Sequence, residues 1–162
     1  MDSLKHQVIA EVIKVAQSML GTAEKSREDA IEESKHHKGA MESRYDTFKE
    51  EAQYLMVAQD VRIVELNSTI SVLTSHLSRL NIACVRAGVF ALVKLEDEAG
   101  EQASYLILPV GGGVVCVANE IKVTTINEAS PLAQAIKGMA KDEEAELNVA
   151  GKKKTFSIIS IS

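Results

Sequence analysis

The hydrophobic pattern of the first eighty residues predicts two long helices that share an apolar seam. Apolar residues recur at steps of three and four along two stretches, which are Val8, Val12, Val15, Met19 and Ala23, and then Leu66, Ile70, Leu73, Leu77 and Leu80. Such spacing places one apolar stripe along an α-helix. Ser26 interrupts the first stripe, and Gln59 and Arg62 interrupt the second, so we expect the helices to pack loosely near their middle.

The two predicted helices meet at a turn near residues 36–42. Gly39 can adopt the positive φ that ends a helix, and the basic residues around it suit the negative end of the helix dipole. If the first helix runs from about residue 3 to 37, a rise of 1.5 Å per residue makes it about 50 Å long. The sequence therefore predicts an antiparallel helical hairpin, of coiled-coil type, over residues 1–80.

After residue 81 the pattern changes to short apolar runs that are typical of strands. The runs, rich in β-branched residues, cover residues 85–95, 105–110, 114–117, 121–126 and 155–161. One helix interrupts them, with Ser130 as its N-cap, Pro131 at its first position and Gly138 at its end. The predicted fold class is α+β: the hairpin, followed by a small antiparallel β-sheet domain over residues 81–162 with one short helix.

Charge and composition narrow the function classes. The net charge is −5, and acidic residues outnumber basic ones in both halves, so neither half has the basic surface of a protein that binds nucleic acid directly. The first twenty residues hold no uninterrupted apolar run, which argues against a membrane span or a signal peptide. Two cysteines without CxxC spacing, Cys84 and Cys116, fit a reduced, cytoplasmic protein in which both are buried.

Residues 130–138, Ser-Pro-Leu-Ala-Gln-Ala-Ile-Lys-Gly, resemble the SPLxxALxGK segment of GreA/GreB-type transcription elongation factors. The segments around it agree in order: residues 93–108 resemble the family's strand-turn-strand, and residues 146–161 resemble its closing hairpin. The stretch that begins at Lys49 resembles the second arm of the family's helical hairpin. The resemblance implies that the C-terminal domain is FKBP-like.

The resemblance also implies a partner, because the hairpin of Gre factors enters the secondary channel of bacterial RNA polymerase. The domain would contact polymerase through Ser130, Pro131, Leu132, Gln134 and Lys137. The hairpin tip would contact the interior through His36, His37, Lys38, Gly39, Met41, Glu42, Arg44 and Asp46. No cofactor is expected.

The tip departs from the pattern of the cleavage-competent members of this family. Those members carry an Asp-x-x-Glu element that holds a second Mg²⁺ in the polymerase active site, whereas residues 38–42 here read Lys-Gly-Ala-Met-Glu. Glu42 remains, with Asp46 one turn further on, and the surrounding basic residues would repel a cation. The chain thus resembles the non-cleaving members and is not expected to be an enzyme, although cleavage stimulation through Glu42 and Asp46 stays open as an alternative.

The residues also bear on a homodimer, a metal site and an isomerase pocket. Val57, Val61 and Val64 leave open an adaptor protein that forms a homodimer through the hairpin. His36 and His37 point about 100° apart on a helix, so they cannot share one metal ion, and no metal site is expected. We also expect flexible or solvated turns at residues 111–113 and 152–154, and a core role for Phe90, Tyr105 and Phe156, which argues against the aromatic pocket of a prolyl isomerase.

Overall fold

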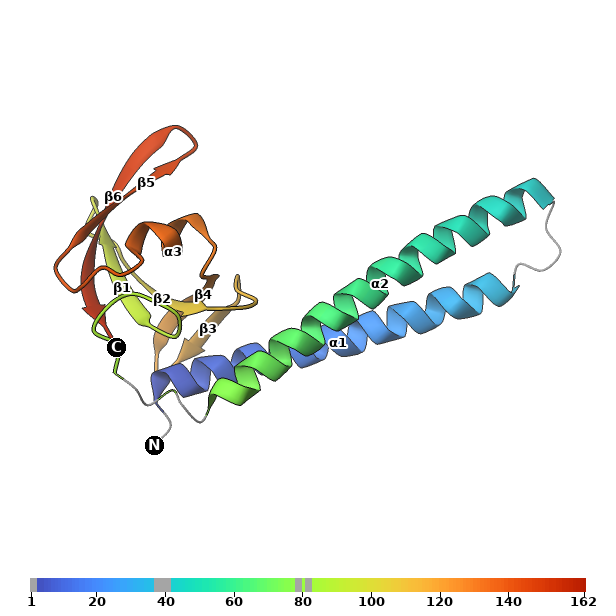
Figure 1. Cartoon of the computed structure of the whole chain (residues 1–162), viewed down its shortest axis with the longest axis horizontal. Helices are drawn as coiled ribbons and strands as arrows, with labels where there is room; N and C mark the ends of the chain where they lie inside the picture. The colour runs from blue at the N-terminus through green and yellow to red at the C-terminus, as the bar shows by residue number, and fades with distance from the viewer. Residues whose placement is uncertain (1–2, 37–41, 78–79, 81–82) are drawn as a thin grey trace. The chain divides into compact units, whose positions relative to one another are not determined.

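The computed structural model describes residues 3–36, 42–77, 80 and 83–162, with the side chains of all of these except residues 36 and 42–45 (Figure 1). Two long helices come first, α1 (Leu4–His36) and α2 (Glu42–His76). The remaining elements are β1 (Leu92–Asp97), β2 (Gln102–Leu108), β3 (Val115–Ala118), β4 (Ile121–Asn127), α3 (Pro131–Ile136), β5 (Glu144–Val149) and β6 (Lys152–Ile161). The predicted fold class is confirmed: two long helices, then a β-sheet with a short helix.

The chain divides into two compact units. One unit is the middle of the helix pair, Ile13–Val72, and the other combines Met1–Val12 with Leu73–Ser162. The sheet unit thus takes in the first turns of α1 and the last residues of α2. Val8, Ile9 and Leu73 are completely buried there, as residues of a shared core.

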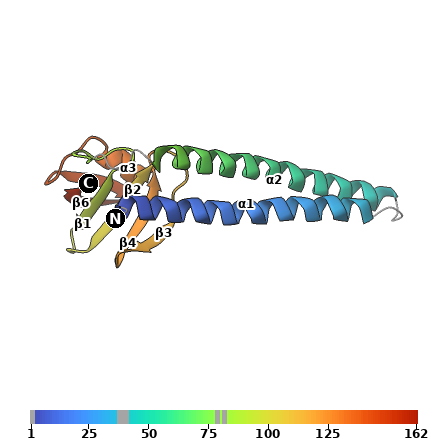
Figure 2. The same ribbon diagram turned by 90° about the horizontal axis from the view of Figure 1, so that it is seen from below.

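The helix unit is held together by a narrow seam. Ala16 and Ala23 of α1 pack against Leu66 of α2, with Leu20, Ile63 and Ile70 partly buried beside them. The two helices run side by side in opposite directions (Figures 1 and 2). An open surface hollow lies beside Ser26, Gln59 and Arg62, the residues that interrupt the predicted stripes.

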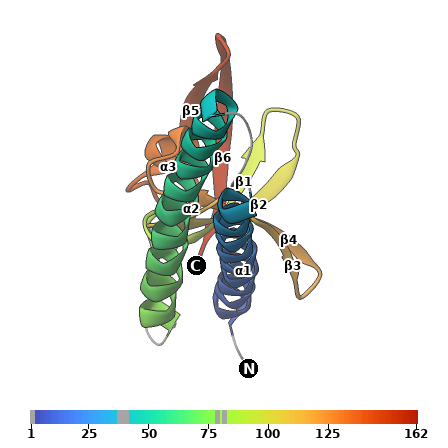
Figure 3. The same cartoon turned by 90° about the vertical axis from the view of Figure 1, so that its right-hand side faces the viewer.

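One sheet of six strands forms the second unit, in the order β3-β4-β2-β1-β6-β5. Its neighbours pair antiparallel except β2 and β4, which are parallel from Ser104↔Val123 to Leu108↔Asn127. The prediction of a fully antiparallel sheet is therefore wrong at this one pair. The chain leaves β2, forms β3 at the edge of the sheet and returns as β4, so that β4 runs in the direction of β2 (Figure 3).

The first face of the sheet carries the main core of the unit. Ala133 and Ile136 of α3 pack there against strand residues Val93, Leu95, Ile107, Ala145 and Ile158, all of them buried. Tyr105 and Phe156 lie partly buried against the same cluster. The expected core role of these two aromatic residues is confirmed.

The opposite face of the sheet is buried as well. Leu106, Leu108 and Val123 alternate with the residues of the first face and are completely or almost completely buried. Cys116 pairs with Val123 on this face, and the carboxylate of Glu11 lies close enough to help raise the pKa of its thiol. The first turns of α1 therefore lie over this face.

Three details differ from the expectations. Residues 85–91 do not continue β1, since Phe90 has a φ of 64° and the segment forms only a bridge between Arg86 and Ala140. Lys152 to Lys154 belong to β6, paired with β5, and the turn lies at Ala150 and Gly151. Cys84 is only half-buried, and the Lys5 ammonium donates a hydrogen bond to its sulfur over 3.6 Å.

Within the predicted turn at residues 111–113, Gly112 packs closely against the end of β4, whereas Gly111 and Gly113 are exposed. Gly112 has a φ of 121°, and a Cβ placed on it would stand 2.7 Å from the backbone nitrogen of Asn127. The Asn127 side-chain amide donates to the carbonyl oxygen of Gly111. Close approach of this loop to the end of β4 therefore requires glycine.

We expect Gly112→Ala to destabilise the protein by about 2 kcal/mol or more, because the new methyl group meets backbone atoms in a conformation that alanine avoids. Gly113→Ala is the matched control, since Gly113 also has a positive φ, 78°, but has no atom within 4 Å of the added carbon. The free energy of unfolding of this control should fall by about 1 kcal/mol. Urea unfolding of both variants measures the difference, and equal losses would contradict the steric explanation.

The buried thiol of Cys116 predicts a pH dependence. Burial, and then the Glu11 carboxylate, raise its pKa above the ordinary value of 9.0. The folded state therefore holds the proton more tightly than the unfolded chain, so the contribution of Cys116 to stability is full below pH 9 and falls as the pH rises above it. Between pH 8 and about 10, the free energy of unfolding should therefore fall less in the Cys116→Ala variant than in the unchanged protein. An identical fall with pH in both proteins would contradict the prediction.

Candidate functional site

The short helix α3 is built by its N-cap. Ser130 has extended backbone angles, φ −65° and ψ 149°, and its hydroxyl oxygen accepts a hydrogen bond from the backbone N–H of Ala133 over 3.3 Å. Pro131 occupies the first helical position, where no N–H is needed. The prediction for the start of this helix is therefore confirmed, and the helix ends at Ile136, one residue before Lys137.

The residues of α3 and its two caps divide into a buried and an exposed side. Ala133 and Ile136 point into the core, whereas Pro131, Gln134 and Lys137 are exposed. The exposed residues follow at steps of three, so they share the outer side of one short segment. Ser130 and Leu132 are half-buried, and Leu132 packs against the core. Of the five residues predicted to dock, three therefore present their side chains outward.

Hydrogen bonds to the backbone hold this outer side in place. The Gln134 side-chain amide donates to the carbonyl oxygen of Glu128 over 2.7 Å. At the other end of the helix the Arg86 guanidinium donates to the carbonyl oxygen of Gly138 over 2.8 Å, and the N–H of Gly138 donates to Ala87. The surface thus has cationic side chains from two segments, Arg86 and Lys137.

Arg86 was not identified from the sequence as part of this surface. It lies 52 positions before Gly138 in the chain, and the two meet because the Arg86 backbone forms a bridge with Ala140. No local motif marks such a long-range contact. The pairing could be found only once the segment 85–91 had been placed beside the end of α3.

The predicted hairpin tip lies largely outside the described residues. Helix α1 ends at His36 and α2 begins at Glu42, while His37, Lys38, Gly39 and Met41 fall in the undescribed stretch between them. The side chains of His36, Glu42 and Arg44 also lie outside what the structure describes. Asp46 is described, and its side chain is exposed on the first turns of α2.

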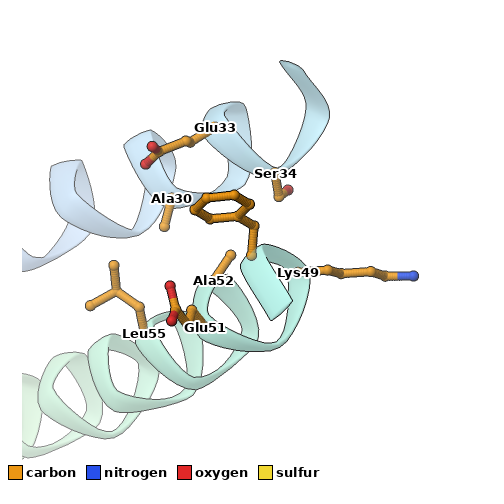
Figure 4. A pocket seen from close by; sticks show the side chains of 8 residues that line it. Ala30, Glu33, Ser34, Lys49, Glu51, Ala52 and Leu55 are labelled. Atoms are coloured by element: carbon orange, nitrogen blue, oxygen red, sulfur yellow. The ribbon is translucent and has the colours of Figure 1, made fainter. Parts of the chain in front are cut away.

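A small cavity separates the two helices near this end of the hairpin (Figure 4). It has a volume of about 230 Å³ and is lined by Ala30, Glu33, Ser34, Phe48, Lys49, Glu51, Ala52 and Leu55. Ala30 and Ser34 line it from α1 and Ala52 from α2, while Lys49 points away from α1. Phe48 and Leu55 remain almost half exposed. The apolar seam is therefore less tightly closed here than around Leu66.

Two classes of site have no candidate in the described part of the chain. Residues 3–36, 42–77, 80 and 83–162 contain no cluster of three or more histidine, cysteine, aspartate or glutamate side chains arranged to hold a metal ion. Among the same residues, neither long helix is apolar enough along its length to cross a membrane. The α3 surface and the helical hairpin are the two candidate sites considered below.

The chain resembles several solved protein structures. No family model matches the chain, and no curated protein sequence matches it. GreA factor homologue 1 (Gfh1) of Thermus thermophilus aligns with 97% of this chain and 94% of its own, at 19% identity and a TM-score of 0.37. Gfh1 of Thermus aquaticus aligns with 97% of this chain and 93% of its own, at 21% identity and a TM-score of 0.37. A GreA/GreB elongation factor from Nitrosomonas europaea covers 57% of this chain and 78% of its own, at 18% identity and a TM-score of 0.37.

We expect Ser130→Ala to destabilise the protein by about 1 kcal/mol, because the substitution removes the side-chain acceptor for the N–H of Ala133. Ser130→Asp is the matched control, since its carboxylate can accept the same hydrogen bond and is favoured at a helix N-terminus. Urea unfolding compares the two. A loss of stability equal in both variants would show that the hydroxyl does not act as the cap.

Proposed function

We propose that the protein is a transcription regulator of the Gre-factor type that binds bacterial RNA polymerase in the cytoplasm. The observation that carries this proposal is the outer side of α3, where Pro131, Gln134 and Lys137 are exposed on the segment whose sequence resembles the Gre motif. The buried members of the same segment hold it on the sheet. A motif with its polar members exposed and held by backbone contacts is suited to docking on a protein.

The hairpin supplies the second element of the proposal. Helix α1 has 33 residues, which at 1.5 Å per residue makes it about 50 Å long. Such a helix pair is long and narrow, because each helix buries only one stripe of side chains against the other. We propose that it enters the secondary channel of polymerase, with residues 36–46 leading.

The chemistry of the leading residues argues against stimulation of transcript cleavage. To hold a second Mg²⁺ together with the ligands of polymerase, the hairpin tip would have to supply carboxylate oxygens. Mg²⁺ binds oxygen ligands and gives up its bound water reluctantly. Residues 36–46 contain two carboxylates, Glu42 and Asp46, but these are four positions apart and are not an Asp-x-x-Glu pair, and Lys38, Arg44 and two histidines surround them. We therefore propose regulation by occupancy of the channel, without metal chemistry and without an enzymatic activity of the protein itself.

A pull-down of purified core RNA polymerase tests the proposal, repeated in competition with a cleavage-competent Gre factor. Competitive binding would support the channel as the site. An absence of binding at micromolar concentration would overturn the proposal and leave only a resemblance of fold. Binding that the competitor does not reduce would place the contact elsewhere on polymerase.

We expect Lys137→Glu to weaken polymerase binding about tenfold, because it reverses the charge of an exposed residue on the α3 surface. Lys122→Glu is the matched control: it makes the same change at an exposed position on β4, at the other end of the sheet from β5. The dissociation constants of both variants are measured by titration against labelled core polymerase. Equal weakening in both would point to net charge and not to the α3 surface.

One observation favours a second candidate function, an adaptor protein that forms a dimer through its hairpin. Val57, Val61 and Val64 are more than half exposed on α2. A second copy could bury them, and a stable dimer of this kind would be too wide for a channel that admits one hairpin. Sedimentation of the purified chain distinguishes the two functions, because the polymerase proposal requires a monomer.

A further inference from the structure

A second apolar stripe runs along the exposed side of α2. We call Tyr54, Val57, Val61 and Val64 the outer stripe; their side chains are 77%, 61%, 54% and 69% exposed. The steps between them are three, four and three, which is the spacing of core positions in a coiled coil. Glu50 continues the line at one end and Ser68 at the other, so the apolar part is about 15 Å long.

The outer stripe lies on the side of α2 that faces away from α1. Each of three stripe residues stands nine positions before a residue of the seam with α1. The pairs are Tyr54 with Ile63, Val57 with Leu66, and Val61 with Ile70. Nine steps of about 100° end about 180° from where they start. The stripe therefore cannot serve the hairpin itself, and it needs an explanation other than the fold.

Acidic residues border the outer stripe on both sides. Glu51 and Glu65 flank it along one edge and Asp60 along the other, and all three are exposed. Three cations lie near the stripe: Arg27 pairs with Asp60, Arg62 stands 3.9 Å from Glu65, and Lys49 lies on the Asp60 edge just before Tyr54. A groove of about 710 Å³ runs beside Tyr54 and Val57 and ends at the Arg27 and Asp60 pair. The whole face is apolar along its centre and acidic at its edges.

These charges disfavour a second copy of the chain as the occupant. If two copies paired their outer stripes in parallel, Asp60 of one copy would face Glu65 of the other across the new interface. In an antiparallel pair, Glu51 would face Glu65 of the second copy, and the two copies of Asp60 would face each other. Like charges opposed in this way are repulsive in either direction. The ion pairs with Arg27 and Arg62 reduce this repulsion for Asp60 and Glu65 but do not reverse it.

We propose that the outer stripe docks an amphipathic helix of another protein, one whose apolar residues are flanked by lysine or arginine. Such a helix would cover the valines and place its cations against Glu51, Glu65 and Asp60. The exposed length of the stripe corresponds to about three turns, so the contact is small and of the transient class. The proposal goes beyond polymerase binding. A helix docked on the outer stripe would widen the hairpin as a second copy would, so this contact belongs to the protein outside the polymerase channel.

The test uses the full chain and two synthetic helical peptides of about three heptads each. Both peptides carry leucine at the core positions; one has lysine at every flanking position and the other has glutamate. Fluorescence anisotropy measures their binding at low and at high salt. We expect the lysine peptide to bind at least about tenfold more tightly than the glutamate peptide, and added salt to reduce that difference.

Substitutions in the chain locate the binding. Val57→Gln with Val61→Gln should weaken the lysine peptide about tenfold or more, whereas Met19→Gln, at an exposed apolar position on α1, should leave it unchanged. Glu51→Lys with Glu65→Lys should reverse the preference between the peptides. Circular dichroism checks that each variant keeps its helices.

Three outcomes would overturn the proposal. The first is equal binding of both peptides, and the second is unchanged binding by the valine variant. The third is a dimer of the unchanged chain, seen by sedimentation at micromolar concentration, that Val57→Gln with Val61→Gln abolishes, because a second copy would then be the occupant. Polymerase binding measured on the same variants keeps this result separate from the fate of the proposed function.

Discussion

The packing of Ile136 and Ala133 against the sheet is the interaction on which the candidate docking surface depends. These two residues bury themselves among side chains from β1, β2, β5 and β6. Because α3 has only six residues, its backbone hydrogen bonds alone would not keep it helical. The core contact and the Ser130 cap hold it together, and with the apolar side turned inward, Gln134 and Lys137 must face outward.

A different constraint governs the helix pair. Two helices packed only against each other can each bury one stripe, so the remaining surface must be compatible with water or with a partner. Much of that surface here is charged or polar, and the Arg27 and Asp60 pair joins the helices across the seam. Such exposed ion pairs contribute little stability, which leaves the seam around Leu66 as the main attachment. The outer stripe is the exception to the charged surface, and its exposure indicates a contact beyond the fold.

The sheet unit shows how one segment can have a structural side and a functional side. Residues 130–138 were identified by their likeness to a family motif, and the structure divides them into a cap, a buried pair and an exposed row. Leu132 illustrates the division, since it was predicted as a contact residue and is half-buried against the core. A motif therefore does not state which of its residues touch a partner, because packing and binding both restrict residue types.

Local chemistry in the sequence determined the long helices, their ends at His36 and Glu42, the Ser130 cap and most of the strands. Periodicity, capping residues and β-branched content act over a few positions, so they can be read along the chain. Only the tertiary structure decided that β4 lies parallel to β2, that residues 85–91 leave the strand, and that Arg86 reaches Gly138. It also decided that the outer stripe faces away from α1. A helix with two apolar stripes can bury either one, and here the contacts with α1 bury the stripe that contains Leu66.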